Sequence, residues 1–237
     1  MIFVLINITH IQQTVISGES IMKKIKVPNT RLFQGMAPDE IQGMLKCLSA
    51  VQKEYKKDDY IFRMGESITS VGLVLKGSVY IIQEDFWGER HILSDCREGQ
   101  LFGESYACVQ SESLMVSVIA SENSEILFLD VNRVLTICSS ACVFHSRLIR
   151  NLLSVISEKN LLLTRKIDHM SRKTIREKLM AYLSFQATRH GNRTFEIPFN
   201  RQQLADYLSV DRSALSAELS KMQKDGLLSY QKNRFTL

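Results

Sequence analysis

The chain contains 237 residues, of which 45% are hydrophobic and 23% are charged. This balance is typical of folded globular proteins and excludes the disordered and fibrous classes, and the length allows two modest domains. The net charge of +5 is distributed unevenly, because residues 169–237 contain twelve basic and six acidic side chains whereas the remainder contains eighteen and nineteen. We therefore expect an anionic partner to contact the C-terminal segment.

The N-terminal segment and the cysteines indicate in which cellular compartment the protein is expected. Residues 1–30 are interpreted as an N-terminal extension that has no basic start and far fewer than the ~20 consecutive apolar residues of a membrane span, so no contact with a membrane is expected. One hypothesis is that residues 1–21 extend the reading frame upstream, because codons for Gly18-Glu19 resemble a ribosome-binding run just before Met22. Five cysteines, an odd number in a chain that needs no disulfides, favour a reducing cytoplasm.

Glycines divide the next segment into short runs. Six of the eleven fall within 39 residues, at Gly65, Gly72, Gly77, Gly88, Gly99 and Gly103. Between and after them lie β-rich runs at 71–75, 77–84, 90–95, 115–120 and 125–130. Short, evenly spaced strands of this kind predict a small antiparallel β-sandwich or barrel over residues 31–137.

A long helix is predicted to follow. No Gly or Pro occurs between Glu104 and His190, and after Val131 the apolar spacing becomes helical, which predicts one long helix that includes residues 138–169. Steps of three and four residues define a seam on it: Ile149, Leu153, Ile156, Asn160, Leu163, Ile167 and Met170. This heptad pattern predicts a parallel two-stranded coiled coil, in which Asn160 favours an in-register pair, and therefore a homodimer.

A helix that packs only on its own domain is the alternative. A second apolar stripe suits that role: Phe144, Leu148, Leu152, Val155 and Leu162. Because a helix that is apolar on two faces must bury both, we expect one face on the sheet and the other on a partner chain.

Residues 170–237 contain three predicted helices and a hairpin. Ser171 is expected to cap the first helix, over residues 171–185. The remaining signals are Asn200 with Gln203 (a capping-box-like helix start), Ser209-Val210 (a turn), Asp211 (the cap of a helix from Arg212 to Lys224), Gly226 (the end of that helix) and Lys232-Asn233 (a hairpin turn). Two short helices around a tight turn, followed by a hairpin, predict a winged helix-turn-helix.

Such a motif inserts the start of its second helix into the major groove of DNA. Base edges would then face Arg212, Ser213, Ser216 and Ala217, with Arg212 as the main contact because a guanidinium pairs bidentately with guanine O6 and N7. Phosphate contacts, which position the protein without reading the sequence, are expected from Arg201, Gln202, Ser216, Lys221, Lys232 and Arg234. The alternative is a solvated basic surface on an ordinary helical hairpin.

From about residue 31 to the end, the chain resembles the Crp/Fnr family, which includes the catabolite activator protein and the fumarate–nitrate reduction regulator. The resemblance rests on NRQQLADYLSVDRSALSAELSKMQKDGLL (200–228) and on FGES (102–105). It implies an α+β fold with an N-terminal antiparallel β-roll (31–137), a dimerisation helix (138–169) and a C-terminal winged helix-turn-helix (170–237). It further implies a cytoplasmic, homodimeric, sequence-specific transcription regulator that binds an inverted repeat in double-stranded DNA, contacts RNA polymerase and responds to an effector. Ser213 and Ala217 depart from the usual base-reading residues of the family, so the half-site should differ.

The resemblance also implies an effector pocket in the β-roll, with the residues Phe102, Gly103, Glu104, Ser105, Tyr106, Ser113, Leu114, Met115, Lys159 and Asn160. In members that bind cyclic nucleotides, an Arg with a Ser or Thr holds the phosphate, but the matching positions here are Leu114-Met115. A buried phosphate would lack a cation, which argues against cyclic AMP, although a regulator that responds to a cyclic nucleotide stays the alternative. Lys159 is either a replacement cation or a solvated charge beside the seam.

Other sensing chemistries have weaker signals. Family members that sense oxygen carry a cluster of N-terminal cysteines, and this chain has none before Cys47, so no iron–sulfur cluster or other metal centre is expected. Cys138 and Cys142 lie one helical turn apart and are either redox-active or buried and inert. His91 and His145 are candidate haem ligands, but single histidines without a partner pattern are more often structural.

The sequence features favour one of three functional classes. A DNA-binding transcription regulator agrees with the caps, the turn, the polar helix face and the local charge. A regulatory module that binds no DNA and acts by protein contact is the second hypothesis. An enzyme is disfavoured, because the sequence has no nucleophile elbow, no metal-spaced His/Cys set and no phosphate loop at a strand–helix junction.

Overall fold

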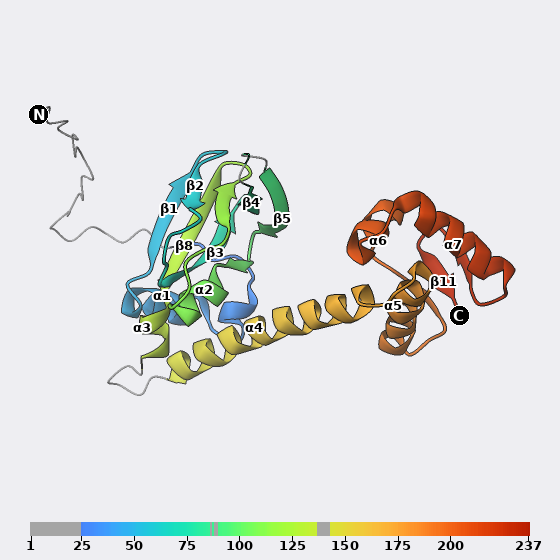
Figure 1. Cartoon of the computed structure of the whole chain (residues 1–237). Helices are drawn as coiled ribbons and strands as arrows, with labels where there is room; N and C mark the ends of the chain where they lie inside the picture. The colour runs from blue at the N-terminus through green and yellow to red at the C-terminus, as the bar shows by residue number, and fades with distance from the viewer. Residues whose placement is uncertain (1–24, 86, 88–89, 137–142) are drawn as a thin grey trace, which may run out of the picture.

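The computed structural model describes residues 25–85, 87, 90–136 and 143–237 (Figure 1). The N-terminal half begins with the 3-10 helix η1 (Arg31–Phe33) and the helix α1 (Pro38–Cys47). Its strands are β1 (Val51–Tyr55), β2 (Tyr60–Phe62), β3 (Ser70–Lys76), β4 (Ser78–Glu84), β5 (Arg90–Arg97), β6 (Leu101–Phe102), β7 (Ser117–Ala120) and β8 (Ser124–Asp130). Two short helices, α2 (Glu104–Val109) and α3 (Val131–Leu135), complete this half. Among the described residues, no helix is both long and apolar enough to span a bilayer.

The strands form two antiparallel sheets of four strands each, in the orders β1-β8-β3-β6 and β2-β7-β4-β5. A buried cluster that includes Val74, Val79 and Phe102 draws side chains from both sheets, so the core of the roll lies between them. Gly72 is required by this packing, because a Cβ atom there would lie 2.2 Å from Cζ of Phe102. The predicted antiparallel β-roll is therefore confirmed, and β1, β2 and β6 are strands that the sequence pattern missed.

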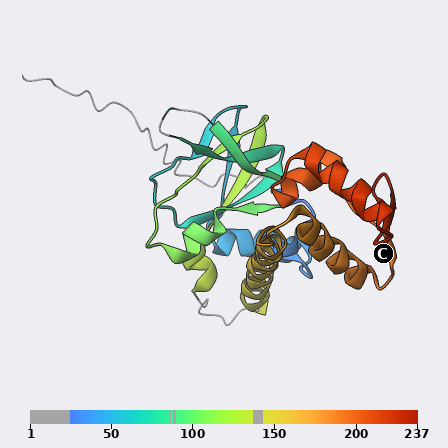
Figure 2. The same ribbon diagram turned by 45° about the vertical axis from the view of Figure 1, so that its right-hand side comes forward.

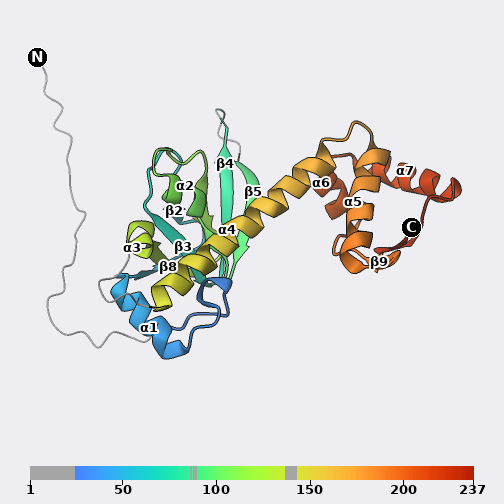
Figure 3. The same ribbon diagram turned by 90° about the horizontal axis from the view of Figure 1, so that it is seen from below.

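Helix α4 (Val143–Met170) connects the two halves of the molecule. Figures 1 and 3 show it lying across one side of the roll and continuing into the C-terminal domain. Leu148 and Leu152 are buried in the core that α4 shares with η1, α1 and the roll. The single helix expected after Val131 is wrong in one respect: α3 ends before Thr136, whose backbone is extended, and α4 is a separate helix. The predicted first residues of that helix, 138–142, lie outside the described residues.

The capping prediction at Ser171 is wrong. Helix α5 (Ile175–His190) begins four residues later, with Thr174 as its cap. The Thr174 Oγ1 accepts from the amide of Glu177 at 3.1 Å, and the Glu177 carboxylate accepts from the amide of Thr174 at 3.1 Å. Ser171 has no Glu or Gln three residues on to complete this reciprocal box, and its hydroxyl donates back to the carbonyl of Asp168.

The C-terminal domain contains the predicted winged helix-turn-helix. Its elements are α5, β9 (Thr194–Glu196), α6 (Arg201–Leu208), α7 (Arg212–Lys224), β10 (Ser229–Gln231) and β11 (Arg234–Thr236), with the strands in the order β10-β11-β9. Asn200 and Gln203 cap α6 reciprocally at 2.9 Å, and Asp211 accepts from the amide of Ala214 at 2.8 Å at the start of α7. Lys232 has a φ of 53° in the hairpin turn. Figures 1 and 3 show this domain at the far end of α4, apart from the roll, and Figure 2 shows α5 close to the end of α4.

Candidate DNA-binding surface and effector cavity

The start of α7 presents the predicted base-reading residues. Arg212, Ser213 and Ala217 are exposed, and Ser216 is half-buried, so these four residues share the accessible side of the first two turns of α7. The opposite side of the helix is buried in the domain core through Leu215, Leu219 and Met222. The arrangement leaves polar side chains free to enter a groove while the apolar side holds the helix in place.

A bridge from α5 orients this helix, and no sequence pattern predicts it. The guanidinium of Arg176 binds the carboxylate of Glu218 on α7 and, at 2.8 Å, the carboxylate of Asp225 just after α7. Glu218 and Asp225 follow Arg176 by 42 and 49 positions in the chain, so no local pattern relates them to it. Two ion pairs from one arginine fix both the rotation and the end of α7.

Four of the residues expected to contact phosphates, Gln202, Lys221, Lys232 and Arg234, are exposed. Arg201 is placed differently, because its guanidinium lies over the rings of Tyr230 at 5.0 Å and Phe235 at 5.9 Å. Desolvation by burial lowers the pKa of Arg201. Its side chain therefore braces the wing against α6, by cation–π contact and by a 3.4 Å hydrogen bond to the carbonyl of Lys232.

A cavity of about 570 Å³ lies between β5, the segment Asn29–Arg31 and α4. Its apolar wall includes Ile81 and Leu101 from the roll and Val155 and Leu162 from α4. Of the ten residues predicted for an effector pocket, Lys159 alone lines this cavity. The others lie elsewhere: Phe102 and Leu114 are buried in the core, Glu104 is buried beneath Lys159, Gly103 and Tyr106 are half-buried, and Ser105, Ser113, Met115 and Asn160 are exposed.

Lys159 forms a partly buried ion pair within its own chain. The sequence alone suggests either a cation for a bound phosphate or a solvated charge. Its Nζ donates to Oε1 of Glu104 at 2.7 Å and to the carbonyl of Leu101 at 2.7 Å. Glu104 is 7% exposed, and its Oε2 has no hydrogen-bond partner in the part of the chain that the structure describes. The ammonium therefore compensates a carboxylate of its own chain and joins α4 to the start of α2.

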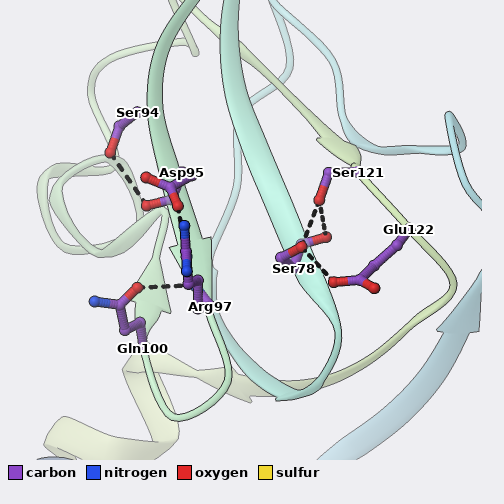
Figure 4. A network of polar contacts seen from close by, with 7 residues as sticks. All are labelled: Ser78, Ser94, Asp95, Arg97, Gln100, Ser121 and Glu122. Carbon is purple, nitrogen blue, oxygen red and sulfur yellow. Dashed lines mark hydrogen bonds and ion pairs between the residues drawn. The ribbon is translucent and has the colours of Figure 1, made fainter. Parts of the chain in front are cut away.

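Polar contacts hold the turns at the ends of β4 and β5, next to the Asp95 and Gln100 side of the cavity (Figure 4). Nε of Arg97 donates to Asp95 at 2.8 Å, and Oε1 of Gln100 accepts from the amide of Arg97 at 2.8 Å, which closes the turn between β5 and β6. On the neighbouring strand, the Ser78 hydroxyl lies 2.6 Å from the Ser121 hydroxyl and donates to Glu122 at 2.7 Å. The polar groups of these side chains are therefore already hydrogen-bonded within the turns of the sheet.

The other candidate sensing residues are dispersed. Burial raises the pKa of the Cys96 thiol in the cavity wall, which keeps it protonated and unreactive near neutral pH. Cys138 and Cys142 lie outside the described residues. His91 is exposed on β5, whereas His145 is 4% exposed and neither of its ring nitrogens has a hydrogen-bond partner among the described residues. In the part of the chain that the structure describes, no three His, Cys, Asp or Glu side chains gather as a metal site.

Helix α4 keeps one apolar stripe against the roll and exposes another. Phe144, Leu148, Leu152 and Val155 pack on the core as predicted, but Leu162 is 60% exposed. In the predicted seam, Leu153, Leu163 and Ile167 are 58%, 61% and 67% exposed, and Asn160 is exposed between them. Ile149 and Ile156 instead pack against the core, and Met170 contacts Ser209. A stripe of leucine and isoleucine side chains this exposed is typical of a protein interface.

Two family models match the chain in the order of its halves. Residues 52–141 match the cyclic nucleotide-binding domain, and residues 177–237 match the Crp-like helix-turn-helix domain. The transcriptional activator protein FnrL of Cereibacter sphaeroides is 30% identical over 77 residues, which are 29% of this chain and 31% of FnrL. Electron transport regulator A of Shewanella oneidensis is 23% identical over 185 residues, which are 75% of this chain and 70% of that protein.

A solved structure of CprK complexed with OCPA shares the fold. It is 14% identical and has a TM-score of 0.56 over 82% of this chain and 90% of that chain. The combination of a nucleotide-binding-type β-roll, a connecting helix and a winged helix-turn-helix defines a class of DNA-binding regulators. Within that class, the chain belongs to the Crp/Fnr family of transcription regulators.

The ion pair of Lys159 yields a stability prediction. Lys159→Met is expected to lower the free energy of unfolding by about 1–3 kcal/mol, because Glu104 would stay buried without its cation. Lys159 is 40% exposed, so water can replace part of its contribution. The double variant E104Q/K159M should lose less than K159M alone, since no buried charge remains. Urea unfolding of the three proteins measures this, and equal losses in the single and double variants would contradict the assignment.

Proposed function

We propose that the protein is a homodimeric, sequence-specific transcription regulator that binds an inverted repeat in double-stranded DNA and responds to an effector in its N-terminal half. The observation that supports DNA binding best is the accessible start of α7, where Arg212 and Ser213 project from a helix that Arg176 locks in place. The same domain contains the whole basic excess of the chain. Regulation of transcription would further require contact with RNA polymerase.

A second copy of this chain is the proposed partner of the exposed stripe on α4. Leu153, Leu163 and Ile167 follow the heptad spacing, with Asn160 at an a position between them. Pairing two such helices in parallel removes the leucines from water and lets the two asparagines bond to each other. A two-fold axis along α4 then places two α7 helices on half-sites about 34 Å apart.

The proposed effector site is the cavity between β5, Asn29–Arg31 and α4. Its volume of about 570 Å³ is within the range of small-molecule pockets, and its wall is mainly apolar. Cyclic AMP fits this cavity poorly, because Lys159 is engaged by Glu104 and the positions that would hold a phosphate are Leu114, which is buried, and Met115, which is apolar and exposed. We therefore assign the cavity to a less charged ligand.

DNA binding is tested first, with an operator obtained by selection from random oligonucleotides. Arg212→Ala should reduce discrimination at one base of each half-site by about 1–3 kcal/mol, whereas Lys221→Ala should weaken all sequences alike and lower the salt slope by about 1. Fluorescence anisotropy over a salt series measures both. Unchanged discrimination in the Arg212 variant would refute its role as base reader, and absence of salt-dependent binding would favour a module that acts by protein contact.

Two substitutions by glutamate on α4 test the proposed dimer. Leu163→Glu should raise the dimer dissociation constant by at least about tenfold, because a leucine side chain is lost from the seam and a charge enters it. Leu161→Glu is the matched control, because Leu161 is 52% exposed but lies outside the heptad positions. Sedimentation equilibrium measures the association. If both variants dissociate equally, or neither does, the seam is assigned incorrectly.

Cyclic AMP is expected to leave the thermal unfolding midpoint unchanged. A ligand at about 100 times its Kd adds about 2.7 kcal/mol to the stability of the state that it binds, which is readily seen as a rise in Tm. Because residues 52–141 match the cyclic nucleotide-binding domain, cyclic AMP is the necessary control in any effector screen. A concentration-dependent rise in Tm that Glu104→Gln abolishes would instead establish a regulator that responds to a cyclic nucleotide.

A further inference from the structure

The last turn of α4 enters the core of the winged domain at one residue. His169 is 3% exposed, although it lies at the end of a helix whose preceding turn is largely exposed. Its ring lies 5.5 Å from that of Tyr182 and 5.6 Å from that of Phe185 on α5, and 5.9 Å from that of Tyr207 on α6. Nδ1 of His169 is 3.0 Å from the Tyr207 hydroxyl.

These rings belong to a larger aromatic group, which we call the hinge cluster: His169, Tyr182, Phe185, Phe199 and Tyr207. Tyr182 is 1% exposed, and burial raises its pKa to about 12. Phe199 lies 6.0 Å from Tyr182 and 5.1 Å from Tyr207, measured between ring centroids. The cluster therefore joins α4, α5 and the helix-turn-helix through one set of packed rings.

Two cations of α4 flank the cluster. The guanidinium of Arg165 lies 5.0 Å from the ring of Phe185, and Nζ of Lys166 lies 6.0 Å from the ring of Tyr207. Both charges sit at the edge of the domain, where cation–π contacts contribute little because water competes for the cation. His169 differs from them, because its ring is buried and it makes a hydrogen bond. The orientation of the domain on α4 should therefore depend most on His169.

The covalent link alone does not fix this orientation. Residues 171–174 between α4 and α5 are exposed and contain no regular helix or strand. Tyr207, in contrast, lies on α6, which packs on α7 within one continuous core. A rotation about the His169–Tyr207 contact would therefore move α7 as a rigid unit with α6.

Small rotations at this point matter for DNA. Helix α7 has 13 residues and is about 20 Å long. Tilting a lever of that length by about 10° moves its end by about 3.5 Å, which is about the rise of one base pair. In a dimer whose two recognition helices must enter successive turns of the major groove, such a shift changes which half-site separation fits.

We propose that His169 is a positioning residue for DNA recognition: through its hydrogen bond to Tyr207 it sets the angle between α4 and the winged domain, and so the half-site separation that the dimer accepts. This inference rests on the proposed dimeric DNA binding. His169 is not among the residues expected to contact DNA. Its proposed role would supply a part of the specificity that base contacts do not provide.

The test uses operators whose spacer is shortened or lengthened by one and two base pairs, and a duplex with a single half-site. His169→Phe keeps an aromatic ring and removes the hydrogen bond from one side, and Tyr207→Phe removes it from the other. Wild type is expected to prefer one spacer by about tenfold over its neighbours. In each variant this spacer preference should fall about fivefold, which is the usual net effect of losing one hydrogen bond. The affinity for the single half-site should stay unchanged.

Two comparisons complete the design. Tyr80→Phe is the control, because it removes a tyrosine hydroxyl from β4 of the roll, outside both the hinge cluster and the winged domain. The double variant H169F/Y207F should lose no more spacer preference than either single variant, since one bond is removed in all three. Wild-type spacer preference in both single variants would overturn the inference and leave the proposed function intact. Absence of specific binding by wild type would overturn both.

Discussion

Helix α4 is apolar on two faces, and the rest of the molecule depends on how both are covered. One face carries Leu148 and Leu152 and closes the core of the β-roll. The other exposes Leu153, Leu163 and Ile167, which gain from burial only if another surface covers them. The helix therefore holds the sensing half, offers a pairing surface and reaches the winged domain with its last turn. A change in any of these contacts acts on the same rigid element.

The pair formed by Lys159 and Glu104 changes what the β-roll can sense. A buried carboxylate requires compensation, and here α4 supplies the cation itself. A diffusible anion would have to displace an internal partner held at 2.7 Å, and with it the second bond of Lys159 to the carbonyl of Leu101. The space that stays open lies on the side of β5 and the Asn29–Arg31 segment. A ligand there would touch α4 directly, through Val155 and Leu162.

The sequence predicts best those parts of the structure whose signals are local. The capping box of Asn200 and Gln203, the cap at Asp211 and the turn at Lys232 each act within a few residues, and each appears in the structure as expected. The cap predicted at Ser171 is wrong because the capping box of Thr174 and Glu177 begins three residues later and satisfies two backbone amides instead of one. The Lys159–Glu104 pair and the Arg176 bridge join residues more than forty positions apart, and the proposed effector cavity is formed by four separate segments. Such contacts depend on tertiary packing, which periodicity and spacing do not encode.

Helix geometry explains how the cavity and the winged domain can be coupled. Lys159 and His169 lie ten residues apart on α4, a distance of about 15 Å along a continuous helix. The hydrogen bonds of an α-helix resist bending over this length, so a displacement of the helix at the cavity is transmitted to the hinge cluster without a relay of side chains. The exposed residues Leu163 and Ile167 lie between these two points, so the same displacement alters the pairing surface. In the proposed function, effector binding, dimer pairing and domain orientation would thus all depend on one variable, the position of α4 relative to the roll.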